Sequence, residues 1–517
     1  MNGQSALDSF DHVVVLMLEN RSFDTILGYL YEGGVPPGKS FDGVAGKALF
    51  NLDQTGRPVP VSKETDYHQP YPDPGEEHAH IMAQLTGPSI STGKPNMGGF
   101  VRDYFHTLTE LGDTWSGSAA QQSPRIMRCF TPDKTPVLSA LAREFAVFDR
   151  WFCAVPSQTW CNRAFWHAAT SWGWVDNPPA FAIGDAWNLE TWDRYSAGRT
   201  LFDLLEDKFG TGSWRVYEDL AIPFTKLVHW GDLKDKVGDA YFRDLEEKSV
   251  FSTNFFQDCA AGALPKYAFL EPHFINRWDG VRWHDDMHPS SVDSELYSDG
   301  GPGSVLLGDQ LVWKVYEAIR NSKSATGNNW SNTLLIITFD EHGGCYDHVA
   351  PSNVPPLDPS GFNTGQGQEG FDFSLLGVRV PMVMVSAGIA RNTIVNEEMH
   401  HCSFLSTMAL KWGLPSLGPR QDIAPPFTSV FSGASRGIET WPPFPKYPGP
   451  PGVTETVAPP LESPANVRLN GLQASILNAI QHHLGSELPA PAAPLVTEGD
   501  ARPLLDLLAE RRRRPGY

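Results

Sequence analysis

The stretch "LLIITFDEHGGCYDH", residues 334–348, joins an apolar segment directly to a cluster of acids and imidazoles. Its opening residues are almost all apolar or β-branched, which predicts a strand buried on both faces. Asp340, Glu341 and His342 follow at once, at a point where removal from water makes a negative charge costly. Adjacent carboxylates in this position indicate a compensating positive charge nearby.

The composition excludes several classes of protein. The chain has 517 residues, a formal net charge of −20 and six cysteines without a CxxC pair. The acidic balance argues against nucleic-acid binding and against adsorption to anionic membranes, and the cysteines suggest neither a disulfide scaffold nor a zinc ribbon. No signal peptide is evident at "MNGQSALDSFDH", and no apolar run approaches the roughly 18 residues of a membrane span. We therefore expect a cytoplasmic protein without stable membrane insertion, or an exported one if a signal has been removed.

Three continuous apolar segments predict buried strands, and amphipathic segments lie between them. The expected strands are residues 12–18, 333–339 and 380–386, and the expected helices include residues 199–209 and 303–322. This alternation favours an α/β fold with a central, mostly parallel sheet flanked by helices.

The C-terminal part differs in composition. Residues 441–464 are rich in proline and predict an arm or linker, followed by a helix at 466–484 and a last helix that ends in four arginines. We expect a catalytic domain over residues 1–440, and the arm with its helices over 441–517. The arginines are typical of a solvated helix end; the alternative is a contact with a second subunit, which would make the protein a homo-oligomer.

Two expected strands end in metal-ligand residues. The first runs into Glu19 and Asn20, and the second into Asp340 and Glu341. Ligands of parallel sheets bind outside the carboxyl ends of the strands, and these hard oxygen donors suit a divalent cation. The sequence therefore predicts one cation at this edge, with Ca²⁺, Mg²⁺ or Mn²⁺ favoured and Zn²⁺ as an alternative.

A third segment, "AVPSQTWCNRAFWHAATSWGW" at residues 154–174, predicts a turn followed by a helix. Thr159 stands at the helix N-terminus, where backbone N–H groups attract anions, and Asn162 and Arg163 lie in the first turn. A hydroxyl beside an arginine suits nucleophilic attack on a phosphate. The alternative is that Thr159 is a simple N-cap.

Together these motifs resemble a known family. "ENRSFD" after the first strand, the T-x-x-N-R turn, and "TLLIITFDEHGGCYDHVAPS" before "GVRVPMVMVS" are similar to the phosphoesterase family of bacterial phospholipases C and acid phosphatases, within the alkaline-phosphatase-like superfamily. The resemblance implies that fold, metal-dependent hydrolysis of a phosphate ester, and a phospho-threonine intermediate on Thr159. The metal ligands it implies are Glu19, Asn20, Thr159, Asp340 and Glu341.

The resemblance also suggests roles for residues around the reacting phosphate. His288 would protonate the leaving oxygen, and either His288 or His78 would activate water. Asn162 and Arg163 would hold phosphate oxygens, and His348 would contact the substrate.

One departure concerns the residues after the nucleophile. Cys161 stands where the family usually has proline, and Trp160 places a bulky ring beside Thr159. An indole at the mouth of the site would favour an apolar or choline-bearing leaving group through a cation–π contact. The alternative is that Trp160 packs in the core.

Three rival functions remain open. A sulfatase would need a C/S-x-P-x-R motif, which neither "CFTPDK" (129–134) nor "CNRAF" (161–165) provides. A hydrolase using the Cys161 thiol would leave the acidic strand ends unexplained, and a non-catalytic phosphate-ester-binding protein would not need the whole set of polar residues. The substrate is expected to be a phosphate ester, with a phospholipid or a choline headgroup among the candidates.

Overall fold

The computed structural model describes residues 6–87, 94–112, 115, 117–179, 186–220, 222–246, 252–275, 284–289, 303–432, 435–448, 468–485 and 494–512. All the expected site residues lie in these ranges. Residues 449–464 of the proline-rich stretch, and Arg513 and Arg514 of the arginine run, lie outside them.

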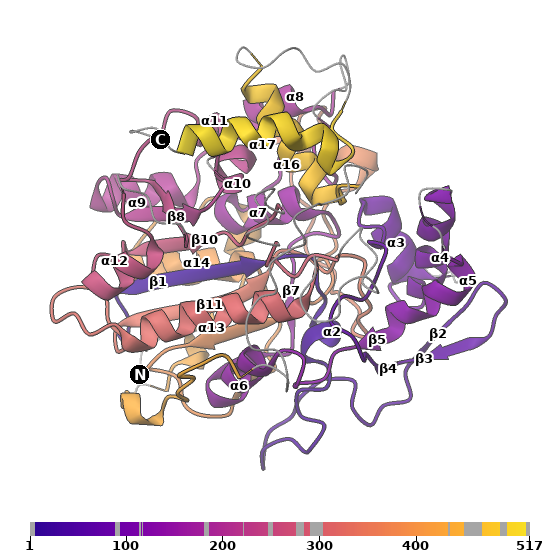
Figure 1. The fold of residues 1–517 in the computed structure, drawn as a ribbon, viewed down its shortest axis with the longest axis horizontal. Helices are drawn as coiled ribbons and strands as arrows, with labels where there is room; N and C mark the ends of the chain where they lie inside the picture. Colours follow the sequence, from indigo (N-terminus) through magenta and orange to yellow (C-terminus); the bar gives the residue numbers. More distant parts are fainter. Residues whose placement is uncertain are drawn as a thin grey trace.

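An eight-stranded sheet forms the centre of the molecule, in the order β13-β6-β12-β11-β1-β10-β8-β9 (Figure 1). Its neighbouring strands are parallel except where β12 pairs with β11 and with β6, so the expected mostly parallel sheet is confirmed. The strands are β1 (His12–Leu18), β6 (Ala146–Phe148), β8 (Trp214–Glu218), β9 (Phe242–Asp244), β10 (Tyr267–Leu270), β11 (Thr333–Phe339), β12 (Met382–Val385) and β13 (Thr393–Val395).

The strands that carry the acids are central neighbours. β1 and β11 pair in parallel with Leu18 opposite Phe339, so both chains leave the sheet at the same edge. Residues 340–381 form loops and 3₁₀ turns without a crossover helix. The chain therefore re-enters the sheet from that same edge, which makes β12 antiparallel.

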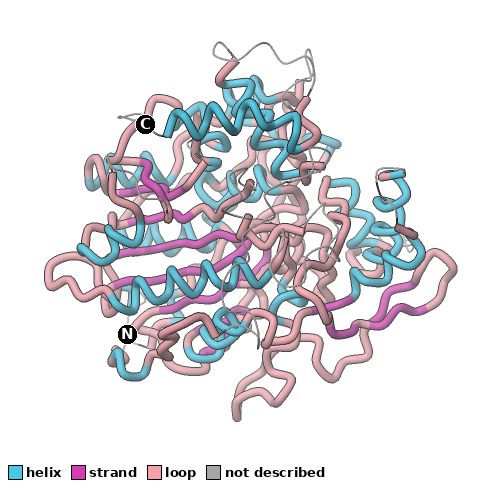
Figure 2. The backbone as a smooth tube through the Cα atoms, viewed as in Figure 1, coloured by secondary structure: helices cyan, strands magenta, loops and turns pink. Residues whose placement is uncertain are grey.

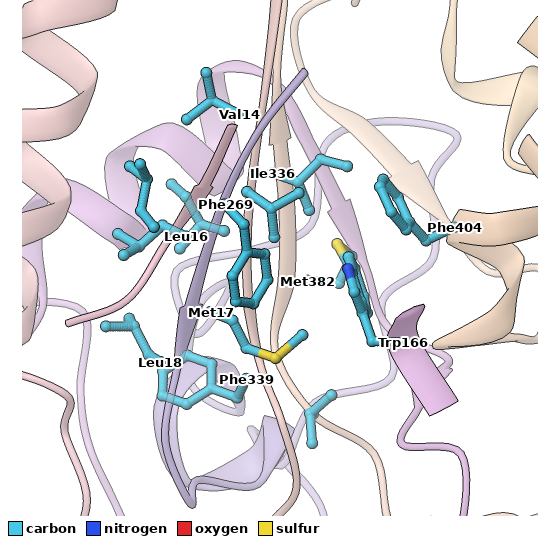
Figure 3. Packing of buried hydrophobic residues seen from close by; sticks show 14 of the residues in the cluster. Val14, Leu16, Met17, Leu18, Trp166, Phe269, Ile336, Phe339, Met382 and Phe404 are labelled. Atoms are coloured by element: carbon cyan, nitrogen blue, oxygen red, sulfur yellow. The ribbon is translucent and has the colours of Figure 1, made fainter. Parts of the chain in front are cut away.

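Helices cover both faces of the sheet (Figure 2). α13 packs against both α6 and α12, and α7 packs with α9 and α14. Figure 3 shows Leu16 and Leu18 on one side of the strands, and Trp166 of α7 and Phe404 of α14 on the other. These helices are α6 (Pro136–Glu144), α7 (Thr159–Ala168), α9 (Leu201–Phe209), α12 (Phe255–Ala261), α13 (Val305–Asn321) and α14 (Cys402–Trp412).

Two of these helices confirm the sequence-based expectations. α9 begins with a capping box made by Thr200 and Asp203, and the Ser304 hydroxyl caps α13. Each cap supplies partners for N–H groups that the first helical turn leaves unpaired.

A smaller lobe lies beside the sheet, on the right in Figure 1. It has its own apolar cluster, which includes Ile81, Leu85 and Phe100. Its elements are β2 (Phe50–Leu52), β3 (Pro58–Pro60), β4 (Ser62–Lys63), β5 (Arg128–Cys129), α3 (His78–Thr86), α4 (Phe100–Glu110) and α5 (Ala119–Gln122). The loop that leads into α3 reaches the acidic edge of the sheet.

The remaining elements are short and connect the larger ones. They are α2 (Phe23–Leu27), β7 (Trp151–Phe152), α8 (Leu189–Tyr195), α10 (Phe224–Val228), α11 (Trp230–Leu233), β14 (Met399–His400) and α15 (Pro419–Asp422).

The C-terminal helices lie on the body of the molecule, at the top of Figure 1. α16 (Gly471–His483) packs against α10 and is followed by α17 (Glu498–Arg512). Asn470 and Gln473 form a capping box at the start of α16, and Leu472 and Ile476 belong to the main apolar cluster. Among the described helices, none has the length and apolar character needed to cross a membrane.

Candidate active site

The ends of β1 and β11 bring four polar residues together. The backbone N–H of Asn20 donates to Asp340 Oδ1 at 3.0 Å, which ties the two strand ends to each other. Asn20 has a φ of 55°, a left-handed conformation that asparagine adopts more readily than most residues. Glu19 and Glu341 flank this pair, and all four side chains are fully buried.

Thr159 lies against the end of β1. It is the first residue of α7, and its Oγ1 is 3.4 Å from Glu19 Oε2 and 3.4 Å from Asn20 Oδ1. The helix N-terminus thus delivers a hydroxyl to the oxygen ligands expected from the sequence.

Arg163, one turn further along α7, pairs with Glu19 Oε1. Its guanidinium lies near the rings of Phe224, Phe269 and Phe274, with centroids 5.3, 5.7 and 5.4 Å away. Nε and Nη1 of Arg163 have no hydrogen-bond partner among the described residues. The arginine therefore compensates one acid of the site and retains two donors.

Asn162 organises the turn before the helix. Its Oδ1 accepts from the N–H of Ala154 at 2.9 Å, and its Nδ2 donates to the carbonyl of Ser157 at 2.9 Å. The amide group expected to hold phosphate oxygens is thus bonded to the backbone that positions Thr159.

The electrostatics of the strand ends favour a bound cation. Burial raises the pKa of Glu19, an effect that Arg163 opposes and Asp340 increases. Burial and Asp340 also raise the pKa of Glu341 well above its usual range. Asp340 Oδ2 and Glu341 Oε1 are buried without a hydrogen-bond partner among the described residues. These oxygens, with those of Glu19, Asn20 and Thr159, fit a divalent cation.

Two further histidines and a glutamine form hydrogen bonds around the end of β11. His401 Nε2 donates to the carbonyl of Asp340 at 2.6 Å, and the Trp151 indole N–H donates to His401 Nδ1 at 3.1 Å. His342 Nε2 lies 2.8 Å from Gln84 Oε1. Gln84 had no sequence signal, because a single amide within a helix carries no motif.

His288 lies on the other side of Asn20. Its Nε2 is 2.9 Å from Asn20 Nδ2, and its Nδ1 donates to the Pro289 carbonyl at 2.7 Å. Burial lowers the pKa of His288 to about 3. Asn20 Nδ2 also donates to Glu76. Glu76 and Asp73 belong to the stretch "DPGEEHAH", residues 73–80, from which the family resemblance implies His78 instead.

His78 begins α3 and lies beside the turn that leads to Thr159. Its Nδ1 donates to the Pro156 carbonyl at 2.6 Å, and its ring packs against Phe371 with centroids 4.7 Å apart. Burial lowers the pKa of His78.

His348 belongs to a separate ionic network. Its Nδ1 is 2.6 Å from Asp24 Oδ2 and its Nε2 is 3.0 Å from Asp42 Oδ1, and Arg379 bonds both Asp24 and Asp347. The structure thus brings His348 to other acids than the ones at the strand ends.

Trp160 is directed into the core. Its side chain is fully buried, and its ring packs edge-on against Trp192 and Phe224, with centroids 5.6 and 5.3 Å away. Its indole N–H donates to Ser475 Oγ of α16 at 3.1 Å. These contacts are those of a packing residue that also anchors a C-terminal helix.

Comparisons with known proteins show the family of this chain. A model of the phosphoesterase family matches residues 10–415. Non-specific phospholipase C6 of Arabidopsis thaliana is 34% identical over 437 residues, covering 81% of this chain and 72% of the relative. Phospholipase C B of Mycobacterium tuberculosis (strain ATCC 25618 / H37Rv) is 26% identical over 440 residues, covering 79% of this chain and 74% of the relative.

Similar solved structures have low TM-scores. A protein of the alkaline phosphatase superfamily from Vibrio parahaemolyticus is 12% identical, with a TM-score of 0.31 over 56% of this chain and 63% of that chain. Murine ectonucleotide pyrophosphatase/phosphodiesterase 5 is 14% identical, with a TM-score of 0.33 over 58% of this chain and 95% of that chain. Kinship therefore rests on the sequence matches.

Proposed function

Because the chain belongs to the phosphoesterase family, and is therefore a phosphoric ester hydrolase, we propose that it uses a divalent cation and Thr159 to cleave phosphate esters of the phospholipase C type. The observation that carries this proposal is the position of Thr159 Oγ1, 3.4 Å from both Glu19 Oε2 and Asn20 Oδ1. The relatives named as phospholipases C support a phospholipid as the phosphodiester substrate.

The residues that would hold the cation are Glu19, Asn20, Asp340 and Glu341, with Thr159. When bound, a cation there supplies Lewis-acid polarisation of a phosphate oxygen and lowers the pKa of a coordinated hydroxyl. Thr159 Oγ attacks phosphorus, so a Thr159–phosphate bond forms while the bond to the leaving oxygen breaks. The proton lost by Thr159 ends on the leaving alcohol, and water then attacks phosphorus to release Thr159.

Arg163 supports this role with Nε and Nη1, which have no partner among the described residues and would bind phosphate oxygens. Asn162 supports it indirectly, because it fixes the turn before the nucleophile. His78 would activate water through Nε2, because its Nδ1–H donates a hydrogen bond to the Pro156 carbonyl.

The hydrogen bond of His288 bears on its proposed role. A carbonyl can only accept, so Nδ1 carries the proton in the neutral ring, and Nε2 accepts from Asn20 Nδ2 at 2.9 Å. This tautomer has no proton on Nε2, so it suits a proton acceptor better than the proton donor suggested by the family resemblance.

Three substrates test the proposal: p-nitrophenyl phosphate, its phosphocholine ester and bis(p-nitrophenyl) phosphate, each with and without chelator. We expect turnover of the phosphocholine ester, its loss with chelator, and its loss in Thr159→Ala. Thr159→Ser should retain activity and should carry a phosphate adduct after acid quenching, as detected by mass spectrometry.

The thiol alternative is tested in the same assay. Burial raises the pKa of Cys161, and its Sγ lies 3.8 Å from the Asp176 carbonyl, so the thiol is a poor nucleophile. Cys161→Ser should keep most of the activity. Loss of activity in Cys161→Ser with retention in Thr159→Ala would overturn the threonine mechanism.

A further inference from the structure

A cluster of ligand-type side chains lies away from the strand ends, where α8 meets the last turn of α16 (Figure 1). Asp193 of α8 and His482 and His483 of α16 each offer one atom, and these atoms lie within 4.8 Å of one another. The other end of α16 reaches the active-site edge, where Asn470 Nδ2 is 3.3 Å from His288 Nδ1. Because α16 has 13 residues, it is about 20 Å long, so the cluster is separate from the proposed active site.

Asp193 and His483 face each other at a distance that a hydrogen bond does not explain. His483 Nε2 is 3.7 Å from Asp193 Oδ2, which is beyond hydrogen-bonding range. Two ligands of a tetrahedral ion, each about 2.1 Å from the metal, are about 3.4 Å apart. His483 Nε2 and Asp193 Oδ1 have no hydrogen-bond partner among the described residues, and the His483 side chain is 6% exposed. A buried imidazole nitrogen and a carboxylate are therefore both available to one ion.

Packing fixes the orientation of the His483 imidazole. Its ring stacks on the indole of Trp230 in α11, with centroids 3.7 Å apart and planes 17° from parallel. α11 in turn packs against α8, the helix that carries Asp193. His482 is exposed, so its ring can change rotamer and turn toward the other two ligands. One imidazole is thus held in place by an aromatic ring, and the second is free to complete the set.

The charge state of the cluster also favours a cation. Burial raises the pKa of Asp193 to about 8, an effect that Glu190 increases and Lys234 opposes. Burial, together with the neighbouring His482, lowers the pKa of His483 to about 3. The His483 imidazole is therefore neutral near neutral pH, the form that binds a metal, and it supplies no positive charge to the buried carboxyl group of Asp193.

We propose that Asp193, His482 and His483 bind a transition-metal ion of the Zn²⁺ type. Two imidazoles and one carboxylate form a donor set that suits Zn²⁺ better than Ca²⁺ or Mg²⁺, which prefer oxygen ligands. Three protein ligands leave the fourth tetrahedral position to water. The inference goes beyond the proposed function and does not rest on it, because this site lies a helix length away from the strand ends.

An ion at this site fastens α16 to the body of the molecule. Its ligands come from α8 and α16, which are far apart in the chain, so the ion closes a long loop. Nearer its start, α16 also contacts the rest of the protein: Gln473 Nε2 donates to the Phe274 carbonyl at 3.0 Å, and Ser475 Oγ accepts from the Trp160 indole at 3.1 Å. The ion therefore stabilises the position of a helix whose first turn lies beside the active site.

Zinc counting on the full-length protein tests the site. The chelator-stripped protein is titrated with Zn²⁺ by calorimetry, and the metal content is measured by mass spectrometry after gel filtration. We expect Asp193→Asn and His482→Ala/His483→Ala each to bind one equivalent less than the unmodified protein, however many equivalents the strand ends take up. Unchanged stoichiometry in either variant would overturn the proposal.

A matched control removes a histidine that lies beside a carboxylate elsewhere on the surface. His106 Nε2 is 3.2 Å from Glu110 Oε1 in α4, and both side chains are exposed. His106→Ala should bind as many equivalents as the unmodified protein. A loss of one equivalent in this control as well would mean that surface histidines take up zinc without a built site, and would overturn the proposal.

Hydrogen exchange tests the role of the ion. Zn²⁺ should slow backbone amide exchange in peptides that cover α16 of the unmodified protein, and should not do so in His482→Ala/His483→Ala. Equal slowing in both proteins would overturn the role, and so would its absence in the unmodified protein, a result that does not depend on how well the variant folds. Neither measurement uses turnover, so failure of the Thr159 mechanism would leave both results unchanged.

Discussion

Replacing Arg163 by methionine should strongly destabilise the metal-free protein. The side chains of Arg163 and Glu19 are 2% and 0% exposed, and the two are directly paired. Methionine keeps an unbranched apolar side chain among the three phenylalanine rings, so the substitution mainly removes the charge. Glu19 would then remain buried without the guanidinium that compensates it.

The expected cost follows from the burial of this pair. Two unit charges about 4 Å apart attract by about 4 kcal/mol at an effective dielectric constant of about 20. Breaking a buried pair by removing one partner costs about 3–5 kcal/mol, because the remaining charge is uncompensated. We expect Arg163→Met to lose this amount in chelator, and less with saturating cation, since the cation would partly neutralise Glu19.

Urea unfolding of four proteins measures this effect: the unmodified chain, Arg163→Met, Glu19→Gln and the double variant. If the uncompensated charge is the cause, the double variant should be less destabilised than the sum of the single variants by about 2 kcal/mol. Additive losses, or a loss in Arg163→Met below about 1 kcal/mol, would refute the reasoning. Turnover should be lost in all three variants, because each removes the Glu19 carboxylate, the Arg163 guanidinium or both.

Three further predictions concern metal binding, packing and pH. Asp340→Asn should weaken cation binding at least about tenfold, or about 1.4 kcal/mol, and remove turnover with an unchanged circular dichroism spectrum; calorimetry that finds unchanged affinity would contradict the metal assignment. Trp160→Ala should cost about 3–5 kcal/mol of stability and lower kcat/KM equally for choline-bearing and plain esters, with Ser475→Ala as a milder control of about 1 kcal/mol; a loss restricted to the choline ester would instead support a substrate contact. Although burial lowers the pKa of His348, hydrogen bonds to two carboxylates raise it to about 9, so its stabilising contribution should be complete below about pH 6.5 and lost as pH rises through about 9. The difference in unfolding free energy between the unmodified protein and His348→Asn should shrink over that range, and a constant difference would argue against the ionic contribution.

The centre of the site could be predicted because it depends on strand order and direction alone. The parallel strands of one sheet all end at the same edge. Glu19 and Asp340 follow such strands, and the register places the preceding residues Leu18 and Phe339 opposite each other. Strand direction therefore predicts a common edge for these acids, and the pairing of β1 with β11 in the structure makes them neighbours.

The outer part of the site could not be predicted, because loop conformations decide it. In "DPGEEHAH" the acid Glu76 points to Asn20, while His78 begins α3 and points to the Pro156 carbonyl. Gly343 and Gly344 have φ values of +58° and +64°, which turn the chain sharply after Glu341. His348 is thereby carried to a different ionic network, and no periodicity in the sequence encodes such a turn.

The acids at the strand ends are tolerated because one oxygen of each carboxylate is hydrogen-bonded to a protein donor, while the other faces the site. Glu19 gives Oε1 to Arg163 and holds Oε2 3.4 Å from Thr159. Asp340 accepts from the N–H of Asn20 at 3.0 Å, and Glu341 accepts from the N–H of Gly343 at 2.7 Å. The second oxygen of Asp340 and that of Glu341 remain unpaired among the described residues. Fixed donors thus orient each carboxylate before any ligand arrives, and the remaining oxygens form a set whose repulsion a divalent cation would relieve. The cost of burying charge at the end of β11 is therefore met in part by protein donors, which set the geometry, and the proposed cation would compensate the remaining charge.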